Sequence, residues 1–188
     1  MAKLMKTAAI ISVAATIFFS FVYGKTSLGW IFSMAITFGT ISYHLGIRLL
    51  VGTLVDGIMH NHADYNRKWF QVHPFEAKLY KKLKVKKWKE KLPTYNKDLF
   101  SLEKKTFDEI AQATCQSEIV HEINALLSFV PLFATYLFGS FMVFLITFVL
   151  AACFDLSFVI IQRYNRPLLV KLAKRSKKRN NEKASYTS

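Results

Sequence analysis

Residues 139–161, GSFMVFLITFVLAACFDLSFVII, decide the fold of this chain. The run contains a single charged residue, Asp155, and it is long enough for the about 20 residues that a helix needs to cross the hydrocarbon core of a bilayer. Further apolar runs of sufficient length occupy residues 7–23, 28–58 and 119–137. We therefore predict an all-α integral membrane protein with four transmembrane helices.

Basic residues are distributed unevenly along the 188-residue chain, which carries a formal net charge of +14 although 52% of its residues are hydrophobic. Residues 60–117 contain 13 lysines and arginines, and residues 162–188 contain nine. The short connections near residues 24–27 and 138–140 contain only Lys25. Because cytoplasmic loops are enriched in Lys and Arg, we predict a multi-pass protein in which both termini and the segment 60–117 are cytoplasmic.

The segment 60–117 is predicted to be a helical insertion between the second and third spans that lies partly on the membrane surface. In PFEAKLYKKLKV (74–85), Phe75, Leu79 and Leu83 recur every four residues, and lysines fill the other face. This pattern is typical of an amphipathic helix that lies in the plane of the membrane interface.

Local signals predict where several elements begin and end. TFDE (106–109) has the pattern of a capping box, so a helix is expected to begin there and to continue into the third span. Pro131 predicts a kink near the far end of that span. Pro167 disfavours helical geometry at the residue before it, which predicts that the fourth span ends near Asn165. The basic residues 176–188 are predicted to be a disordered tail.

The N-terminus, the cysteines and the basic charge bear on processing and partners. Lys3 and Lys6 precede the first apolar run, as in a signal peptide, but no small-x-small cleavage pattern follows, so this run is predicted to remain as a span. Cys115 and Cys153 fall on the cytoplasmic side, where thiols stay reduced, so no disulfide is predicted. The basic charge predicts contact with anionic headgroups of the lipid bilayer. No nucleic-acid recognition motif accompanies it, so no nucleic-acid partner is predicted.

The ionisable residues of spans two to four all lie in the cytoplasmic halves of these spans. The residues within or beside the spans are His44, Arg48, Glu118, His121, Glu122, Asp155, Gln162 and Arg163. A charged group in the bilayer costs on the order of a few kcal/mol, and it usually faces the bundle interior or a water-filled cavity. These residues therefore predict a polar pocket that opens to the cytoplasmic leaflet. The alternative is a set of interfacial residues whose charges extend to the headgroups.

Glu118 and His121 are the candidate catalytic pair. Their i, i+3 spacing puts both on one helix face, where the carboxylate can orient the imidazole and raise its basicity. A histidine held in this way could take a proton from a hydroxyl group. The alternative is a structural hydrogen-bonded pair, which the spacing alone favours.

A metal site is the less favoured interpretation of HNHAD (60–64). His60, His62 and Asp64 alternate in this segment and could bind a metal ion if the chain is extended there. No cysteine or further ligand cluster accompanies them, so we predict a solvated loop and no metal.

Three blocks of the sequence resemble the glycosyl-4,4′-diaponeurosporenoate acyltransferase family. Its members are small bacterial membrane proteins associated with the final acylation step in making staphyloxanthin-type carotenoids. The blocks are FEAKLYKKLKVKKWKEKLP (75–93), SEIVHEI (117–123) and VIIQRYNRPLL (159–169), in the family's order. The likeness covers about residues 55 to 175, and QRYNRP is its most specific element. Leu168 and Glu122 depart from the family's pattern, so the acceptor need not be a glycosylated carotenoid.

The resemblance implies an acyltransferase of the bacterial cell membrane. It would move a fatty acyl chain onto a hydroxyl of a membrane-embedded glycolipid or glycosylated terpenoid at the cytoplasmic leaflet. The expected co-substrate is an acyl thioester donor such as acyl-CoA, and no bound cofactor is expected. In this interpretation His121 is the general base and Glu118 orients it.

The remaining site residues are assigned to substrate binding. Arg163 and Arg166 would contact phosphates of the donor or stabilise the oxyanion, and Asn165 would donate to the oxyanion or to the sugar. The other candidate substrate-binding residues are Gln162, Glu76, Trp88, Lys89, Arg48 and Asp155.

Other classes of function stay open. The sequence has no self-sufficient catalytic motif, which also fits a non-enzymatic assembly partner or a small transporter. A transporter should carry polar groups through the full depth of the membrane, whereas the outer halves of spans two to four have no ionisable residue. Transfer of another small group, such as methyl, onto a lipid is the enzymatic alternative.

Overall fold

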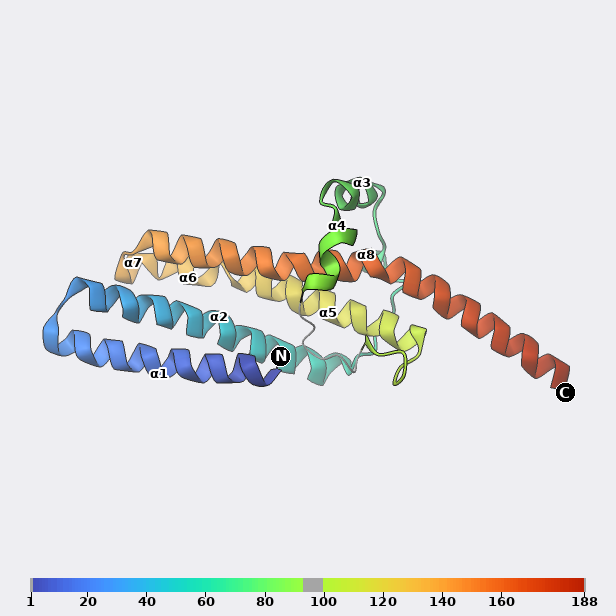
Figure 1. Cartoon of the computed structure of the whole chain (residues 1–188), viewed down its shortest axis with the longest axis horizontal. Coiled ribbons are helices and arrows are strands. Elements are labelled where there is room, and N and C mark those ends of the chain that lie inside the picture. Colours follow the sequence, from blue (N-terminus) through green and yellow to red (C-terminus); the bar gives the residue numbers. More distant parts are fainter. Residues whose placement is uncertain (1, 93–99, 188) are drawn as a thin grey trace. The chain divides into compact units, whose positions relative to one another are not determined.

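The computed structural model describes residues 2–92 and 100–187, with the side chains of residues 3–92 and 100–182 (Figure 1). Every regular element within these ranges is a helix. Four helical segments are long and apolar enough to cross a membrane: Lys3–Thr26, Gly29–Met59, Phe107–Phe138 and Phe141–Glu182. The predicted all-α class and the four candidate spans are confirmed. Residues 93–99 of the predicted insertion lie outside the described residues.

The chain forms two compact units. The first unit contains Met1–Leu54 and Val120–Leu156, and the second contains Val55–Ile119 and Ser157–Ser188. The helices α2, α5 and α8 each contribute residues to both units.

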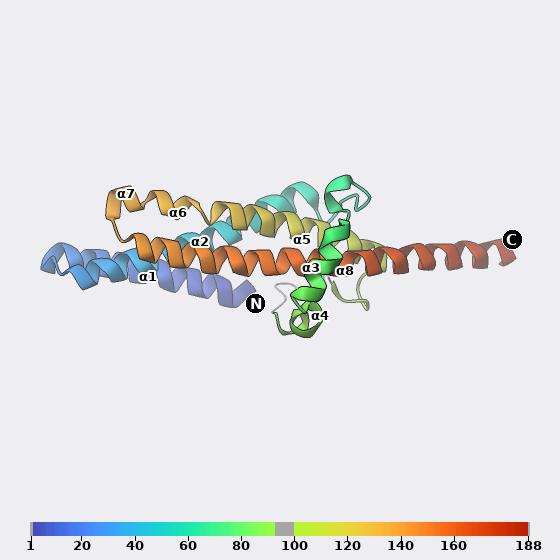
Figure 2. The same cartoon turned by 90° about the horizontal axis from the view of Figure 1, so that it is seen from above.

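In the first unit, α1 (Ala2–Thr26) and α2 (Gly29–Met59) lie side by side as an antiparallel pair, which can be followed in Figures 1 and 2. The Phe19 and Phe38 rings stack with their centroids 5.5 Å apart, and the Tyr23 and Phe32 ring centroids lie 4.9 Å apart. The Oγ1 atom of Thr16 lies 3.5 Å from the hydroxyl oxygen of Ser42. Aromatic contacts and a contact between two hydroxyl groups therefore join the two helices.

The segment from α5 to α8 follows several of the predicted signals. The helix α5 (Phe107–Leu127) begins at the expected capping box: the Thr106 amide donates to Glu109 Oε2 at 2.8 Å, and the Glu109 amide donates to Thr106 Oγ1 at 3.3 Å. The helix is interrupted shortly before Pro131, and two short helices follow, α6 (Val130–Phe133) and α7 (Thr135–Phe138). Gly139 has a φ of 65°, a left-handed conformation that suits glycine, and it leads into the turn before α8 (Phe141–Thr187).

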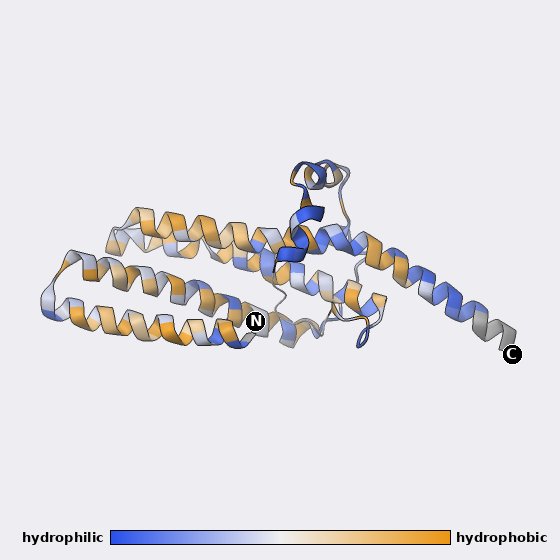
Figure 3. Ribbon diagram, in the orientation of Figure 1, coloured by the Kyte–Doolittle hydropathy of each residue, from blue (hydrophilic) through white to orange (hydrophobic). Residues whose placement is uncertain are grey.

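In the second unit, short helices follow the end of α2: η1 (Lys68–Phe70), α3 (Pro74–Lys82), α4 (Val85–Trp88) and η2 (Lys89–Lys91). The helix α3 begins at Pro74, as predicted. The face of this segment that carries Phe75, Leu79 and Leu83 is exposed. The side chains of Glu76 and Tyr80 are buried. Figure 3 shows α3 and α4 as largely hydrophilic, in contrast to the hydrophobic α1. The exposed apolar residues agree with the predicted amphipathic pattern.

The C-terminal helix differs from the prediction. We expected the fourth span to end near Asn165 and residues 176–188 to be disordered, but α8 continues through Pro167 as far as Thr187. Proline removes one helical N–H group, and here the arginines at positions 163 and 166 anchor the turn around it through contacts outside the helix. In the tail, Lys and Arg are good helix formers, and Lys177 forms an ion pair with Asp108 of α5. The helices also extend beyond the apolar runs 7–23, 119–137 and 139–161.

Candidate functional site

A histidine, an aspartate and an arginine meet in the first unit. His121 Nδ1 lies 2.9 Å from Asp155 Oδ1, and Arg48 forms a salt bridge to the other carboxylate oxygen, Oδ2. We call these three residues the histidine site. They come from α5, α8 and α2, respectively, so the site requires three helices to pack together.

Burial makes the charge balance of the histidine site important. The Asp155 side chain is fully buried, and the side chains of Arg48 and His121 are 11% and 21% exposed. An isolated buried carboxylate would be strongly destabilising, so Asp155 needs the positive charge of Arg48. Arg48 is held in turn by the carbonyls of His44, at 2.6 Å, and Ala151, at 3.1 Å. The arginine thus fixes the carboxylate against which the imidazole is oriented.

His44 lies one helical turn before Arg48 on α2. Its side chain is buried, and neither ring nitrogen has a hydrogen-bond partner among the described residues. His44 is therefore a further buried polar residue of the same helices, while the predicted pocket open to the cytoplasmic leaflet stays a prediction.

A second cluster of charges lies in the second unit. Glu76, Glu118, Arg163 and Arg166 form a continuous set of salt bridges, which we call the arginine network. The two oxygens of Glu118 accept from different arginines, Oε1 from Arg163 Nη1 at 2.6 Å and Oε2 from Arg166 Nη2. The side chain of Glu118 is fully buried.

Arg163 uses all five of its N–H groups in contacts within the protein. Nε and one Nη2 donor bind the two oxygens of Glu76 at 2.9 and 2.6 Å. Nη1 donates to Glu118 and, at 2.9 Å, to the Trp69 carbonyl, and Nη2 also donates to the Gln71 carbonyl at 2.8 Å. A guanidinium has five donors, so none is left for a substrate in this structure.

Arg166 is similarly occupied. Nε and Nη2 donate to the hydroxyl and carbonyl oxygens of Thr114 at 3.0 and 3.1 Å, and Nη1 donates to the Phe70 carbonyl at 3.0 Å. The guanidinium carbon also lies 5.0 Å from the centroid of the Phe70 ring. Together, Arg163 and Arg166 bind the consecutive carbonyls of residues 69–71 and fix that loop against α8.

The arginine network changes the acidity of Glu76. Burial alone would raise the pKa of this carboxyl group, but hydrogen bonds from Arg163, the His73 amide and the Tyr80 hydroxyl lower the pKa to about 2. Burial and the bond to Glu76 raise the pKa of the Tyr80 phenol. Glu76 is therefore ionised over the physiological pH range.

The other predicted substrate-binding residues have partners near the arginine network. Lys89 Nζ donates to Asn165 Oδ1 at 2.9 Å and lies 5.1 Å from the centroid of the Tyr164 ring. Gln162 donates to the Ser117 hydroxyl at 3.1 Å. The Trp88 indole donates to the Leu83 carbonyl at 2.9 Å. These contacts join α8 to α5 and to the short helices of the second unit.

A family model for glycosyl-4,4′-diaponeurosporenoate acyltransferases matches residues 66–175, more than half of the chain. The chain belongs to this acyltransferase family. The match begins later than residue 55, the expected start of the likeness, and it includes all of QRYNRP. No curated protein and no solved structure matches the chain.

The region that matches the acyltransferase family contains the whole arginine network, and it contains His121 and Asp155 of the histidine site. Arg48 and His44 precede it. The family match therefore covers the proposed base and its carboxylate partner, while the arginine that balances this carboxylate lies in the N-terminal part of the chain.

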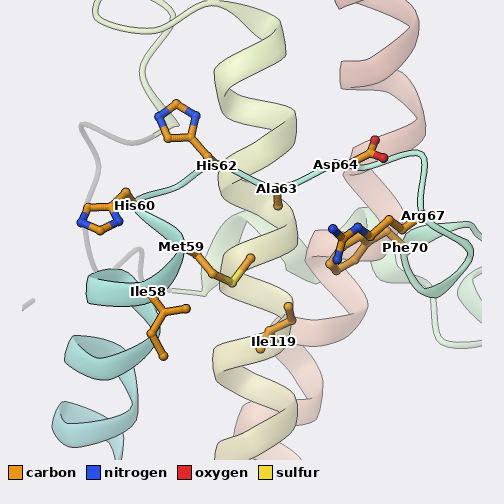
Figure 4. Close-up of a pocket in the computed structure, with 9 residues that line it drawn as sticks. All are labelled: Ile58, Met59, His60, His62, Ala63, Asp64, Arg67, Phe70 and Ile119. Carbon is orange, nitrogen blue, oxygen red and sulfur yellow. The ribbon is translucent and has the colours of Figure 1, made fainter.

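The HNHAD segment lines a pocket of about 740 Å³ in the second unit (Figure 4). His60 and His62 lie on one side of this pocket, and Asp64 and Arg67 lie on the other. The described residues include no group of three or more His, Cys, Asp or Glu side chains that could hold a metal ion. Cys115 and Cys153 are both free thiols.

The sequence identified most members of both clusters but not their partners. It paired Glu118 with His121, whereas the structure pairs His121 with Asp155 and Glu118 with the arginines. Spacing along one helix reports only local neighbours, and Asp155 is 34 positions away in the sequence. The one available signal was the position of Asp155, the only charge within the fourth apolar run.

Proposed function

We propose that this acyltransferase moves a fatty acyl chain from a thioester donor to a hydroxyl group of a membrane-embedded glycolipid or glycosylated terpenoid. The family match supports the acyl transfer, and a glycosylated carotenoid is the acceptor that the family's name suggests. The four apolar helices support an acceptor that is itself dissolved in the membrane.

The hydrogen bond between His121 Nδ1 and Asp155 carries this proposal. An ionised carboxylate at Nδ1 favours the tautomer with its proton on that nitrogen, which leaves the basic lone pair on Nε2. The same carboxylate stabilises the imidazolium ion that forms when Nε2 takes a proton. The salt bridge from Arg48 fixes the Asp155 carboxylate in position. Asp155 therefore replaces Glu118 as the residue that orients the base.

The proposed reaction begins when His121 Nε2 removes the proton from the acceptor hydroxyl. The hydroxyl oxygen attacks the carbonyl carbon of the thioester and forms a tetrahedral intermediate. Collapse of this intermediate breaks the carbon–sulfur bond, and the leaving thiolate takes the proton from the imidazolium. The products are an ester and a free thiol, and the histidine returns to its neutral form.

Arg163, Arg166 and Glu118 have a structural function in this proposal. Sequence analysis assigned the arginines to donor phosphates or to the oxyanion, but their donors bind carboxylates and the carbonyls of residues 69–71. Recognition of substrate by Arg163 would require it to break these buried contacts, at a cost of about 1–3 kcal/mol for each polar group left unsatisfied.

The cytoplasmic leaflet is the proposed location of the reaction. The distribution of lysines and arginines supports a cytoplasmic position for the insertion. The exposed Phe75, Leu79 and Leu83 support contact of this insertion with the membrane surface. An acyl thioester in the cytoplasm and an acceptor in the inner leaflet could then meet without a further carrier.

The test compares lipid extracts by mass spectrometry from cells that lack the gene, express it or express His121→Gln. The expected result is a lipid heavier by one acyl residue that depends on the gene and is lost with His121→Gln. An unchanged lipid profile would favour an assembly partner or a transporter. Addition of a smaller group, such as methyl, would favour another transferase. Either result would contradict acyl transfer.

A further inference from the structure

A second cavity, of about 580 Å³, lies in the second unit between the loop 65–72 and residues 166–175 of α8. We call it the basic pocket. Tyr65, Phe70 and Val72 contribute apolar and aromatic surface from the loop, and Pro167 and Val170 contribute apolar surface from the helix. The pocket therefore offers a wall against which a flat or apolar part of a ligand can pack.

The open side of the basic pocket is strongly cationic. Lys171, Lys174 and Arg175 line it, and their i, i+3, i+4 spacing puts them on one face of α8. All are exposed, and none forms a salt bridge with another residue in the described parts of the chain. Among the described residues, none of those that line the pocket is acidic. The uncompensated charge favours an anionic ligand.

The loop side of the basic pocket is bordered by Asp64, whose Oδ1 accepts hydrogen bonds from the backbone amide and the side chain of Asn66, and by Asp108, which is paired with Lys177. Asp108 accepts a hydrogen bond from the Tyr65 hydroxyl at 2.9 Å, and Lys177 forms a 2.8 Å ion pair with the same oxygen. Tyr65 is thereby held at the edge of the basic pocket. Lys177 is balanced by Asp108, so it does not add to the positive charge of Lys171, Lys174 and Arg175.

The loop wall of the basic pocket is fixed before any ligand binds. The Gln71 side chain donates to the Tyr65 carbonyl at 2.8 Å and closes the loop on itself. Arg163 and Arg166 bind the carbonyls of residues 69–71 from α8. A preformed wall reduces the entropy lost on binding. This provides a physical reason for the two arginines in QRYNRP, because they hold the loop that forms one wall of the pocket. The positive charge of the pocket comes from the basic residues that follow QRYNRP in the sequence.

We propose that the basic pocket binds the phosphate groups of the acyl thioester donor, a nucleotide-linked thioester of the coenzyme A type. Lys171, Lys174 and Arg175 pair with the phosphates, and the apolar and aromatic wall packs against the nucleoside. The thioester is joined to the phosphates by a long flexible arm, so this site need not adjoin the base. The identity of the ligand as a donor rests on the proposed function, whereas the phosphate chemistry does not.

Phosphate also occurs in anionic lipid headgroups, so the experiment separates the two sources. The full chain is reconstituted in nanodiscs of phosphatidylcholine, which has no net charge, and coenzyme A binding is measured by calorimetry. Saturable binding is expected, with competition by adenosine 3′,5′-bisphosphate but not by pantetheine, which lacks phosphate. Nanodiscs that contain phosphatidylglycerol serve as the second arm, and coenzyme A should still bind there.

The chain supplies a matched control for the cations of the basic pocket. The double variant Lys174→Gln, Arg175→Gln should raise the Kd for coenzyme A by about tenfold or more. The variant Lys178→Gln, Arg179→Gln removes the same residue pair one turn further along α8, outside the pocket, and should leave the Kd nearly unchanged. Thermal unfolding of both variants checks that they fold.

Several outcomes would overturn the proposal. They are no saturable binding of coenzyme A, equal loss of affinity in both double variants, or complete displacement of coenzyme A by phosphatidylglycerol, which would assign the cations to lipid headgroups. Failure of the proposed function is distinguishable because it is read from lipid masses. If the chain binds coenzyme A through these residues but does not acylate lipid, the phosphate site stands. Its interpretation as a site for the acyl donor would then be wrong.

Discussion

At the scale of single residues, QRYNRP (162–167) is a set of tertiary contacts rather than a group of topology signals. Arg163 alone satisfies acceptors from two carboxylates and two loop carbonyls. A lysine could provide the positive charge that fixes membrane orientation. However, its ammonium group has only three N–H donors, and they do not lie in one plane as the five donors of a guanidinium do. The geometry of this network therefore explains the choice of guanidinium groups.

Acid should weaken the arginine network through Glu76. The pKa of this carboxyl group is about 2 in the folded chain, against an ordinary value of 4.5. A group whose pKa is depressed by folding stabilises the fold above the unfolded pKa and loses that contribution as the pH falls to the folded pKa. The free energy of unfolding should therefore decrease between about pH 4.5 and 2, by on the order of 3 kcal/mol from this group. Denaturant titrations across this range measure the effect.

Glu76→Gln provides the comparison for that pH dependence. The variant should be less stable than wild type at neutral pH, and its stability should depend less on pH below 4.5. Glu90→Gln removes an exposed carboxylate of η2 and should leave the wild-type pH dependence in place. Identical acid dependence in wild type and Glu76→Gln would show that Glu76 does not contribute as its contacts imply.

Asp155→Asn should reduce acyl transfer by about 10²–10⁴. The amide retains the shape of the carboxylate but no longer favours the Nδ1-protonated tautomer of His121 or stabilises its cation. The measurement is the initial rate of acylated lipid formation in purified membranes, normalised to folded protein. Asp56→Asn makes the same substitution at an exposed aspartate that belongs to neither the histidine site nor the basic pocket, and it should leave the rate nearly unchanged. A normal rate for folded Asp155→Asn would remove the orienting function from this carboxylate.

Sequence analysis identified many residues of both clusters because charges in apolar helices are conspicuous. His121, Asp155 and Arg48 were selected in this way. Their mutual contacts were not predictable from spacing, since each residue belongs to a different helix. The same limit explains why Arg163 was assigned to substrate: its five acceptors come from three separate regions of the chain.

At the scale of elements, α3 (Pro74–Lys82) has an unusual arrangement of faces. An amphipathic helix in a soluble protein normally turns its apolar face to the core. Here the ionised carboxylate of Glu76 and the phenol of Tyr80 are buried. In contrast, Phe75 is 64% exposed and Leu79 is 38% exposed. The salt bridges to Arg163 hold the polar side against α8, which leaves the apolar side available for lipid.

We expect the Phe75 side of α3 to contact the membrane surface. In a Cys153→Ser background, an environment-sensitive fluorophore on Phe75→Cys should be quenched strongly by a quencher attached to lipid chains. The same fluorophore on Lys81→Cys, at an exposed lysine about 120° away around α3, should be quenched weakly and should respond to an aqueous quencher. Equal quenching at both positions would contradict an interfacial orientation of this helix.

Local signals predicted the beginnings of elements well, because caps depend on residues close in sequence. The start of α3 at Pro74 and the capping box of α5 are examples. Pro167 was misinterpreted because its effect depends on distant partners. A proline weakens a helix, but contacts of Arg163 and Arg166 with the loop 69–71 compensate for the missing bond. Sequence alone carries no sign of such compensation.

At the scale of the whole molecule, the two chemistries belong to different units. The first unit contains the histidine site, and the second contains the arginine network and the basic pocket. The composition agrees with this division: the helices of the first unit are predominantly apolar, and lysines and arginines are concentrated in the second. The proposed phosphate-bearing donor and the proposed membrane acceptor would accordingly meet residues of different chemical character, basic in the second unit and apolar in the first.

The proposed reaction requires that the basic pocket face the cytoplasm, where acyl thioesters occur, and this prediction can be tested by labelling. In the Cys153→Ser background, a membrane-impermeant maleimide added to intact cells should label Lys25→Cys, in the short connection between α1 and α2. It should label Lys178→Cys, whose side chain is 81% exposed, only after the cells are permeabilised. Cys115 is buried and should stay unreactive in both cases.

The positive-inside rule gives this orientation because the basic residues cluster in the second unit. Labelling of Lys178→Cys in intact cells would put the basic pocket outside, away from any cytoplasmic donor, and the proposed reaction would lose its co-substrate.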